Sequence, residues 1–454
     1  MALMALAASA AQAQSTASGF FNDGYMYRHN INPAVGNRQS YFAIPVLGNV
    51  DLSLRSTVGA GDLVYWQNGK TVSFLHPDID TDKAVRPFKK DIRMEQDMRL
   101  DLLSMGFAGS RGRGYTTVSL GVREHTSLSL PGQLFRAAKE GITNATYDLS
   151  GISAHADAFG ELAIGHSHKV GEHLELGGKL KVLVGGANVD AVAEGTQLYL
   201  GDDSWTATVD AEVQASVKGL SYISKTEMRG PEGQQKPHSY VNELDFDSPG
   251  INGFGAALDL GAVYTVGKDL KIGVAVLDLG GIKWNNNMLA STNGPREVNT
   301  DGYEFSVDED DANSFDNEFE RLGDAVKDLY ELSDMGDKGS RFTMLGATLN
   351  ASLEYKMPFY RRMSVGLLST TRFQGDRTWN EERFSLNLAP VNWFALSVTA
   401  ATGTFGASYG GMVSLHPKGF SIYAGADCLG APYDKNGIPL GRAVQANFGL
   451  VIPF

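Results

Sequence analysis

Several features that common protein classes require are scarce in this chain of 454 residues. A single cysteine, Cys428, excludes an intramolecular disulfide and a cysteine-rich metal site. No apolar run approaches the roughly 18–20 residues of a membrane-spanning helix, which excludes a helical membrane protein. The formal net charge of −13 argues against nucleic acid as a partner, because phosphate contacts require basic surfaces. No Pro- or Ser-rich linker divides the chain, so one large repetitive domain is expected.

Basic residues are also missing from the N-terminus, MALMALAASAAQAQ. Its apolar stretch ends in Ala11-Gln12-Ala13, which fits the small-x-small pattern of signal-peptidase sites, so residues 1–13 are expected to be a signal peptide. No Lys or Arg precedes Arg28, and the simplest account is that the true start lies upstream of Met1. The alternative is a small-residue tail on a cytosolic protein.

What the chain does contain, after residue 90, is a two-residue alternation of side chains. In LKIGVAV, residues 270–276, the apolar residues share one parity while Lys271, Gly273 and Ala275 share the other. Such a period is that of a β-strand. In 115–130 the apolar residues again share one face, and the opposite face carries the ionisable Arg123 and His125, as expected for lipid on one side and water on the other. The pattern predicts an all-β fold, a transmembrane antiparallel β-barrel in the bacterial outer membrane.

The alternating segments give a strand count for a barrel formed by residues 41–454. Residues 14–40 have no clear period and are expected to form an N-terminal plug in the lumen. Sixteen strands are expected: 41–57, 94–108, 115–130, 151–169, 172–185, 188–201, 204–219, two in 251–284, 341–357, 362–373, 383–388, 393–401, 406–416, 419–428 and 442–454. A count of 14 stays open if some of the short segments do not cross the membrane.

The count of 16 puts every long connection on one side, as barrels of this class require. The expected outer loops are 58–93, 131–150, 220–250, 285–338 and 429–441, with a short helix in 131–141. The expected inner turns are 109–114, 170–171, 202–203, 267–268, 358–361 and 417–418.

The largest outer loop, residues 285–338, is acidic and is expected to be partly helical. Apolar residues recur in it at intervals of three to four, which predicts an amphipathic helix over 315–332. Its apolar face needs a place to pack, on the barrel rim, inside the lumen or on a partner. The candidate partner-docking residues are Phe315, Phe319, Leu322 and Val326.

Few residues stand out as functional sites. Asp259 and Asp278 recur in matched Asp-Leu-Gly contexts, either as ligand-binding groups in the lumen or as hydrogen-bonding groups at a strand bend beside glycine. Phe454 ends a regular final strand and is expected to act as a membrane-insertion signal. His166 and His168 share a strand face but lack a third ligand at a defined spacing, so no metal site is expected. No catalytic constellation is present, so neither an enzyme nor a cofactor is expected.

Three stretches resemble a Bacteroidota family of outer-membrane barrels of unknown function. They are the hairpin 251–284 with its two Asp-Leu-Gly motifs, the segment LGGKLK at 176–181, and the closing NFGL at 447–450. The triplet Asn32-Pro33-Ala34 resembles the N-terminal plug of FadL-like transporters and of the related PorV-like barrels of type IX secretion. The resemblance implies an outer-membrane location and a plugged barrel. FadL-like barrels commonly have 14 strands, which disagrees with the count of 16.

Two functions follow from these observations. The first is passive transport of a small hydrophobic ligand through the plugged lumen, as the FadL-like resemblance implies. The second is a non-enzymatic structural or accessory subunit of an outer-membrane complex for secretion or assembly, which docks proteins through the extracellular loop 285–338. The expected partners are therefore outer-membrane lipid together with either a small hydrophobic ligand or a protein.

Overall fold

The computed structural model describes residues 17–67, 70–109, 112–229, 235–248, 250–301, 324–325, 327–427 and 443–454. Its elements, in chain order, are η1 (Ala17–Gly19), η2 (Arg28–Asn30), β1 (Tyr41–Ala43), β2 (Asn49–Ser56), α2 (Ala60–Leu63), β3 (Val64–Gln67), β4 (Lys70–Ser73), α3 (Thr81–Val85), η3 (Arg86–Phe88), β5 (Ile92–Ala108), β6 (Gly114–Leu130), α4 (Gly132–Glu140), β7 (Ala145–Asp148), β8 (Ile152–Val170), β9 (Leu174–Leu200), β10 (Trp205–Val217), β11 (Leu220–Arg229), β12 (Lys236–Phe246), β13 (Gly253–Val266), β14 (Leu270–Trp284), β15 (Met288–Ser291), β16 (Arg296–Asn299), β17 (Ser333–Asp337), β18 (Arg341–Met344), β19 (Ala347–Lys356), β20 (Met363–Phe373), β21 (Trp379–Val391), β22 (Phe394–Gly403), β23 (Gly406–Leu415), β24 (Ser421–Asp427) and β25 (Ala443–Pro453). Within these ranges no helix is long and apolar enough to cross a bilayer.

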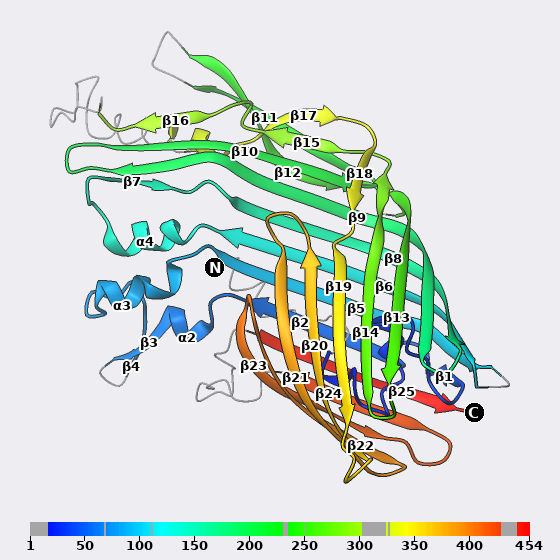
Figure 1. The fold of residues 1–454 in the computed structure, drawn as a ribbon. Coiled ribbons are helices and arrows are strands. Elements are labelled where there is room, and N and C mark those ends of the chain that lie inside the picture. The colour runs from blue at the N-terminus through cyan, green and yellow to red at the C-terminus, as the bar shows by residue number, and fades with distance from the viewer. Residues whose placement is uncertain are drawn as a thin grey trace.

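Fourteen antiparallel strands close into a barrel (Figure 1). The ring runs through β2, β5, β6, β8, β9, β13, β14, β19, β20, β21, β22, β23, β24 and β25. It closes where β25 pairs with β2. Two short strands continue strands of this ring. Strand β1 pairs with the same neighbours as β2, and β18 pairs with β14 beside β19. Closure leaves the ring without a free strand edge, which is what a bilayer demands of a sheet.

The predicted count of 16 strands is wrong, and the alternative of 14 is confirmed. Residues 172–185 and 188–201 are one strand, β9, because the residues expected to turn at 186–187 form only a bulge. The N-terminal half of β9, residues 174–185, pairs with β13, and its C-terminal half, residues 187–200, pairs with β10. Strand β10 therefore lies outside the ring, and both surplus strands of the count come from this one place.

Side chains on the ring face outward when apolar and inward when polar. On β9, Leu180 and Val182 are 69% and 54% exposed on the outer face, whereas Lys179 and Lys181 are 3% and 5% exposed on the inner face. A soluble barrel would bury the leucine and expose the lysine. The opposite arrangement is that of a barrel with lipid outside and a polar lumen inside. The protein is thus an all-β barrel of the bacterial outer membrane, as predicted.

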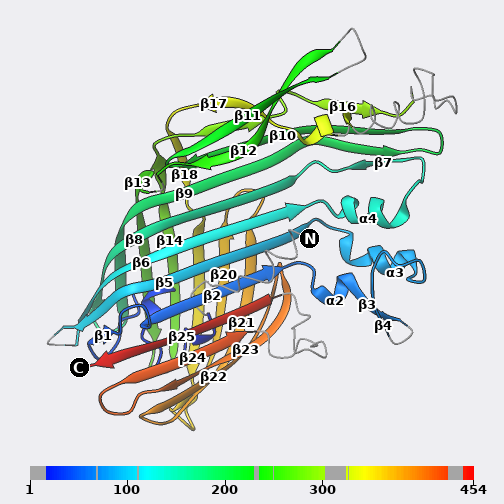
Figure 2. The ribbon, with the colours of Figure 1, turned by 180° about the vertical axis from the view of Figure 1, so that it is seen from behind.

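Beyond the ring, an additional β-structure extends the wall on the side of the long loops (Figure 2). Strands β10, β15, β16 and β17 form a sheet there. Residues 220–250 were predicted to be a loop, but β11 and β12 form a hairpin in them. The predicted short helix in 131–141 is confirmed as α4. Residues 202–203 were assigned to the inner side, yet Asn144 of the outer loop donates a 2.6 Å hydrogen bond to Asp202. That turn therefore lies on the outer side.

Parts of the sequence prediction lie outside the described residues. They are the signal peptide 1–13, the whole of loop 429–441, and the docking residues Phe315, Phe319, Leu322 and Val326. The described parts of 285–338 contain β15, β16, β17 and a helical stretch at 324–325 and 327–330.

Residues 17–40 lie inside the barrel and form its plug. Three contacts on different walls show this: Ser18 Oγ is 2.8 Å from Thr399 Oγ1 on β22. Asn350 Nδ2 on β19 donates to the carbonyl oxygen of Ile31 at 2.8 Å, and Lys179 Nζ on β9 donates to Asn30 Oδ1 at 2.8 Å. A segment that contacts β9, β19 and β22 at once can only be within the ring.

A cluster of tyrosines attaches this plug to the wall near the short turns. Tyr25 and Tyr27 of the plug pack with Tyr41, Tyr115 and Tyr423, and all five are buried. The rings of Tyr25 and Tyr423 meet edge to face with centroids 5.0 Å apart. Aromatic pairs of this geometry stabilise by about 0.5–1.5 kcal/mol beyond the area they bury.

The assignment of the lipid-facing wall predicts the cost of a charge there. Leu180→Arg, in the membrane part of β9, is expected to destabilise the barrel by about 2–4 kcal/mol. The measurement is a urea titration of folding into lipid vesicles.

The matched control is Ile223→Arg on β11, a half-exposed apolar residue outside the ring, which is expected to change the free energy of unfolding by less than about 0.5 kcal/mol. Equal losses in the two variants would contradict the assignment of β11 to the water-exposed extension.

Candidate functional site

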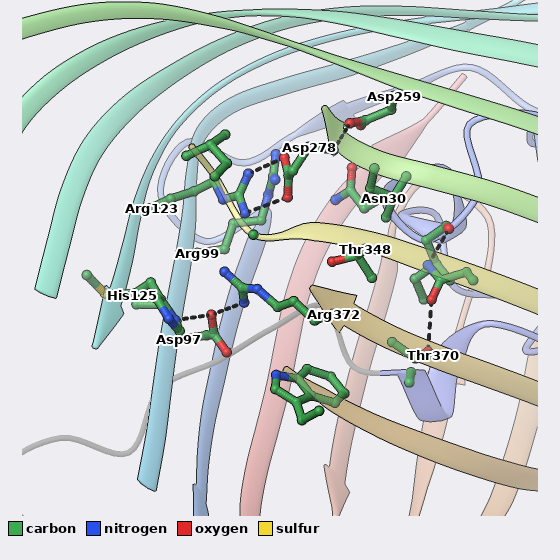
Figure 3. Close-up of a pocket in the computed structure, with 18 of the residues that line it drawn as sticks. Asn30, Asp97, Arg99, Arg123, His125, Asp259, Asp278, Thr348, Thr370 and Arg372 are labelled. Carbon is green, nitrogen blue, oxygen red and sulfur yellow. Dashed lines mark hydrogen bonds and ion pairs between the residues drawn. The ribbon is translucent and has the colours of Figure 1, made fainter. Parts of the chain in front are cut away.

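A cavity of about 100 Å³ lies in the middle of the lumen, between the plug and the wall (Figure 3). Ala17, Asn30 and Ile31 of the plug form one side of it. The wall side is densely charged: it includes Arg55, Asp97, Arg99, Arg123, Glu124, His125, Asp157, Lys179, Lys181, Asp259, Asp278, Arg372 and Glu381. These residues come from strands far apart in sequence, and the closed ring brings them together.

Asp278 reaches the lumen because β14 bulges at this position. The pairing with β13 shifts between Leu258 and Leu260, and Asp278 adopts a φ of +60° in the left-handed region. Among residues other than glycine, aspartate is one of the few that visit this region readily. The bulge turns both Leu277 and Asp278 inward, and the Asp278 backbone N–H donates to Asp259 Oδ1 at 2.8 Å.

The two aspartates belong to a network that we call the central ion-pair cluster: Arg99, Asp101, Arg123, Glu161, Lys181, Asp259 and Asp278. Lys181 Nζ lies 2.6 Å from Asp278 Oδ1 and 2.7 Å from Asp259 Oδ1. The guanidinium of Arg123 donates to both carboxylate oxygens of Asp278, at 2.8 and 2.9 Å. This bidentate arrangement is the strong form of an ion pair.

The sequence left two roles open for Asp259 and Asp278, and the geometry has features of both. The side chains face the lumen, and they also join the two strands at a bulge. Their oxygens already accept hydrogen bonds from Lys181 and Arg123, so a ligand cation would have to displace these side chains. A ligand-binding role for the two aspartates stays a prediction.

Two further ion-pair groups line the lumen, and the sequence analysis missed both. On one side, Asp97 lies 2.6 Å from Arg372 and 2.9 Å from His125. On another, Arg383 bridges Glu381 and Asp427, each at 2.8 Å. The only sequence signal for these residues is their position on the polar, inward-facing side of the alternating strands. Their partners lie up to 275 positions apart in the chain, and pairing across the lumen cannot be inferred before the ring is known.

The start of the plug is held by the Arg383 group. Ser18 Oγ accepts a hydrogen bond from Arg383 at 2.7 Å and donates one to Asp427. Farther along, Asn32 Nδ2 donates to the carbonyl oxygens of Ala262 and Val274, at 3.3 Å each. These contacts attach the start and a middle part of the plug to the wall.

Glycines in the wall provide the seat of the Asn32-Pro33-Ala34 triplet. A Cβ on Gly261 would lie 2.2 Å from Asn32 Oδ1, and one on Gly177 would lie 2.2 Å from the carbonyl oxygen of Pro33. Such distances are far too short for real atoms, so only glycine fits at both positions. This contact explains why Gly261 follows Asp-Leu in one motif and why Gly177 stands in LGGKLK.

A second, larger cavity of about 480 Å³ lies between the plug and the short-turn end of the barrel. We call it the periplasmic vestibule. Plug residues 20–21, 23, 28 and 35–38 form part of its wall. Residues 29–34 of the plug separate it from the central cavity, which touches Asn30 and Ile31 instead.

Other predicted residues lie elsewhere on the barrel. His166 and His168 are exposed on β8, with the same parity as the exposed Leu162 and Ile164, and their ring centroids are 6.1 Å apart. His168 also borders the larger cavity. Phe454 is exposed at the end of β25, its ring centroid lies 6.5 Å from that of Phe107, and its N–H donates to the carbonyl oxygen of Ser40. Its role in insertion stays a prediction.

One group in the outer extension has the residue types of a metal site. Ligand atoms of His238, Asp328 and Glu331 lie within 4.8 Å of one another, the only such group among the residues that the structure describes. Arg229 occupies this place, with ion pairs to Asp328 and Glu331. Its hydrogen bonds, above all to Glu331, raise the pKa of Arg229, so the guanidinium stays charged and neutralises both carboxylates.

Comparison with protein families identifies the chain. Residues 33–427 match the model of a family described as "Family of unknown function (DUF5723)", and the chain belongs to that family. This agrees with the barrel family of unknown function that the sequence motifs resemble, while the Bacteroidota origin stays a prediction. Comparison with curated proteins gives no match.

Solved outer-membrane barrels are similar to the chain only at low identity. They include a Pseudomonas aeruginosa FadL homologue, with 11% identity, a TM-score of 0.41, and 98% of this chain and 99% of that chain covered. The Pseudomonas putida toluene transporter TodX has 8% identity and a TM-score of 0.40, with 98% and 94% covered. The Ralstonia pickettii toluene transporter TbuX has 10% identity and a TM-score of 0.40, with 98% and 94% covered. At such TM-scores the evidence for the architecture is the strand pairing of this chain itself, and toluene is a solute of those transporters.

The central ion-pair cluster predicts a large effect of removing one buried charge. Asp278→Ala leaves Arg123 and Lys181 short of an acceptor, and breaking a buried pair in this way costs about 3–5 kcal/mol. The measurement is chemical unfolding of the barrel in detergent micelles.

The control is Asp269→Ala, which removes the partner of the exposed Arg361 at a short turn and is expected to cost about 0–1 kcal/mol. A loss for Asp278→Ala no larger than that of the control would show that the cluster does not stabilise the barrel.

Proposed function

We propose that this protein is a non-enzymatic outer-membrane transport protein whose lumen is closed by residues 17–40 and opens when that plug moves. The observation that carries the proposal is the position of the plug. It separates two cavities in one lumen, and it contributes residues to the walls of both. A plug with a cavity on either side is the arrangement expected of a gated pathway.

The contacts of the plug support movement and not a permanent core. Several of its anchors are hydrogen bonds between neutral groups: Asn32 donates to the carbonyl oxygens of Ala262 and Val274, and Asn350 of the wall donates to that of Ile31. Each net hydrogen bond of this kind contributes about 0.5–1.5 kcal/mol, and the groups can bond to water when the plug leaves. The tyrosine cluster lies close to residue 41, where the chain enters the wall, and can serve as a fixed end.

The side chains that line the two cavities indicate which class of solute could pass. The sequence suggested a small hydrophobic ligand, but charged side chains line both cavities. Transfer of an apolar molecule into such a lumen gives little hydrophobic gain, because the walls hold water through their charges. Polar solutes fit these walls better, and a hydrophobic ligand remains the competing outcome of the test.

Plug deletion tests the transport function directly. The intact protein is expected to be silent in planar bilayers, whereas deletion of residues 14–40 is expected to give discrete conductance steps. The double variant Asn32→Ala with Asn350→Ala, which removes two anchors, is expected to open briefly and rarely.

Replacing residues 64–73, the outer β3–β4 hairpin, by a short Gly-Ser linker is the control and is expected to stay silent. Silence of the deletion would contradict a gated pathway. Saturable binding of a hydrophobic fluorophore by the intact protein would favour the hydrophobic ligand predicted from the sequence.

An accessory subunit that docks other proteins is the second candidate function, and one observation favours it. A groove of about 430 Å³ on the outer extension is lined by Tyr222, Tyr240, Leu244, Tyr330 and Leu332, among others. Leu244 and Tyr330 are 52% and 65% exposed there. Exposed apolar residues gathered in a groove are typical of protein contact sites.

Leu244→Glu separates this function from transport. If docking is the function, the variant is expected to migrate at a smaller mass than the wild type after mild extraction from its own membranes. Thr71→Glu, on another outer hairpin, is expected to leave the mass unchanged. A wild type that already migrates as a single chain would exclude a stable complex.

A further inference from the structure

The periplasmic vestibule concentrates positive charge in a chain whose formal net charge is −13. Six basic and three acidic side chains belong to its wall, which is an excess of three positive charges. The basic residues are Arg28, Arg38, Arg113, Lys169, Lys271 and Lys356, and the acidic residues are Asp23, Glu175 and Glu354.

The acidic residues neutralise only two of these cations. Asp23 lies 3.5 Å from Arg28, and Glu175 lies 3.4 Å from Lys169. Glu354 is the cross-strand neighbour of Lys271 in the register of β14 and β19. No ion pair joins Glu354 to Lys271 among the described residues.

Four cations are therefore left over. Arg38, Arg113, Lys271 and Lys356 make no side-chain hydrogen bond and no ion pair with any residue that the structure describes. Lys271 and Lys356 are partly buried, whereas Arg38 and Arg113 are exposed. An unpaired cation that is partly removed from water is costly, and the cost falls when an anion binds beside it.

These four cations face one space from different directions. Lys271 and Lys356 project inward from adjacent strands, alternating with the exposed Ile272 and Tyr355. Arg38 belongs to the plug and Arg113 to the turn between β5 and β6. Wall, turn and plug thus each supply positive charge to the same cavity.

We propose that the periplasmic vestibule is a binding site for small oxyanions with two or more negative charges, a class that includes inorganic phosphate and di- and tricarboxylates. The inference rests on the proposed transport function and names the class of solute. The volume of about 480 Å³ is within the range of small-molecule sites. We place the anion in the vestibule and not in the central cavity, because in the central cavity buried carboxylates already pair with the basic side chains.

Binding to the purified full-length barrel in detergent tests the proposal. Inorganic phosphate, succinate and citrate are titrated separately by calorimetry at low ionic strength, where charge pairing is least screened. At least one of the three is expected to bind saturably. The double variant Lys271→Gln with Lys356→Gln is expected to weaken that binding about tenfold or more, because each lost charged hydrogen bond is a large part of the affinity.

Two further variants make the result specific. Lys268→Gln removes a charge from an adjacent short turn outside the cavity and is expected to leave the affinity unchanged. Glu354→Gln removes an acidic group from the wall and is expected to tighten binding severalfold. Circular dichroism of each variant checks that the barrel has folded.

The outcomes separate the proposals. No binding of any of the three anions, or equal affinity of the Lys271/Lys356 double variant and the wild type, would overturn the oxyanion site. A preference for phosphate over succinate and citrate, or the reverse, would identify the chemistry within the class. Specific binding combined with silence of the plug deletion in bilayers would sustain the site and refute transport.

Discussion

The lumen of this barrel depends on one constraint: a charge that is taken out of water must find an opposite charge at hydrogen-bonding distance. Lipid covers the outer face of the 14-strand ring, so the polar side chains of its strands point mainly inward. The lumen cannot fill with apolar side chains, and its rigidity comes from ion pairs instead. The bidentate contact of Arg123 with Asp278 and the contacts of Lys181 with two aspartates are the densest part of this arrangement.

The same constraint explains why the plug is polar at its contacts and aromatic at its base. Ser18 and Asn32 make hydrogen bonds with polar groups of the wall. The tyrosines fill the part of the lumen where the plug continues into β1. An apolar plug could not make these hydrogen bonds. In the vestibule the pairing of positive with negative side chains is incomplete, and that is where we propose that a ligand binds.

The sequence predicted the class of fold well, because alternation is a local property that each strand displays by itself. Which residues face lipid and where β14 lies followed from parity alone. The count failed at β9, where glycine and alanine at 186–187 resemble a turn but form a bulge within a 27-residue strand. The local sequence pattern cannot distinguish a turn from a bulge here, since the outcome depends on which strands pair with the two halves of β9. The partners of Asp278 were hidden for a related reason: Arg123 is 155 positions away, and only the closed ring makes them neighbours.

The short connection between the plug and the wall also bears on how the barrel is assembled. Ser40 is the last plug residue, and the next one, Tyr41, pairs with Pro453 of the final strand. Strand β25 is made last, and its pairing with β1 and β2 completes the ring. The plug also contacts β22 and β19, so it is enclosed on all sides once that seam forms. The N-terminal segment precedes all strands of the seam in the chain, so it is available as a surface on which the last strands are laid.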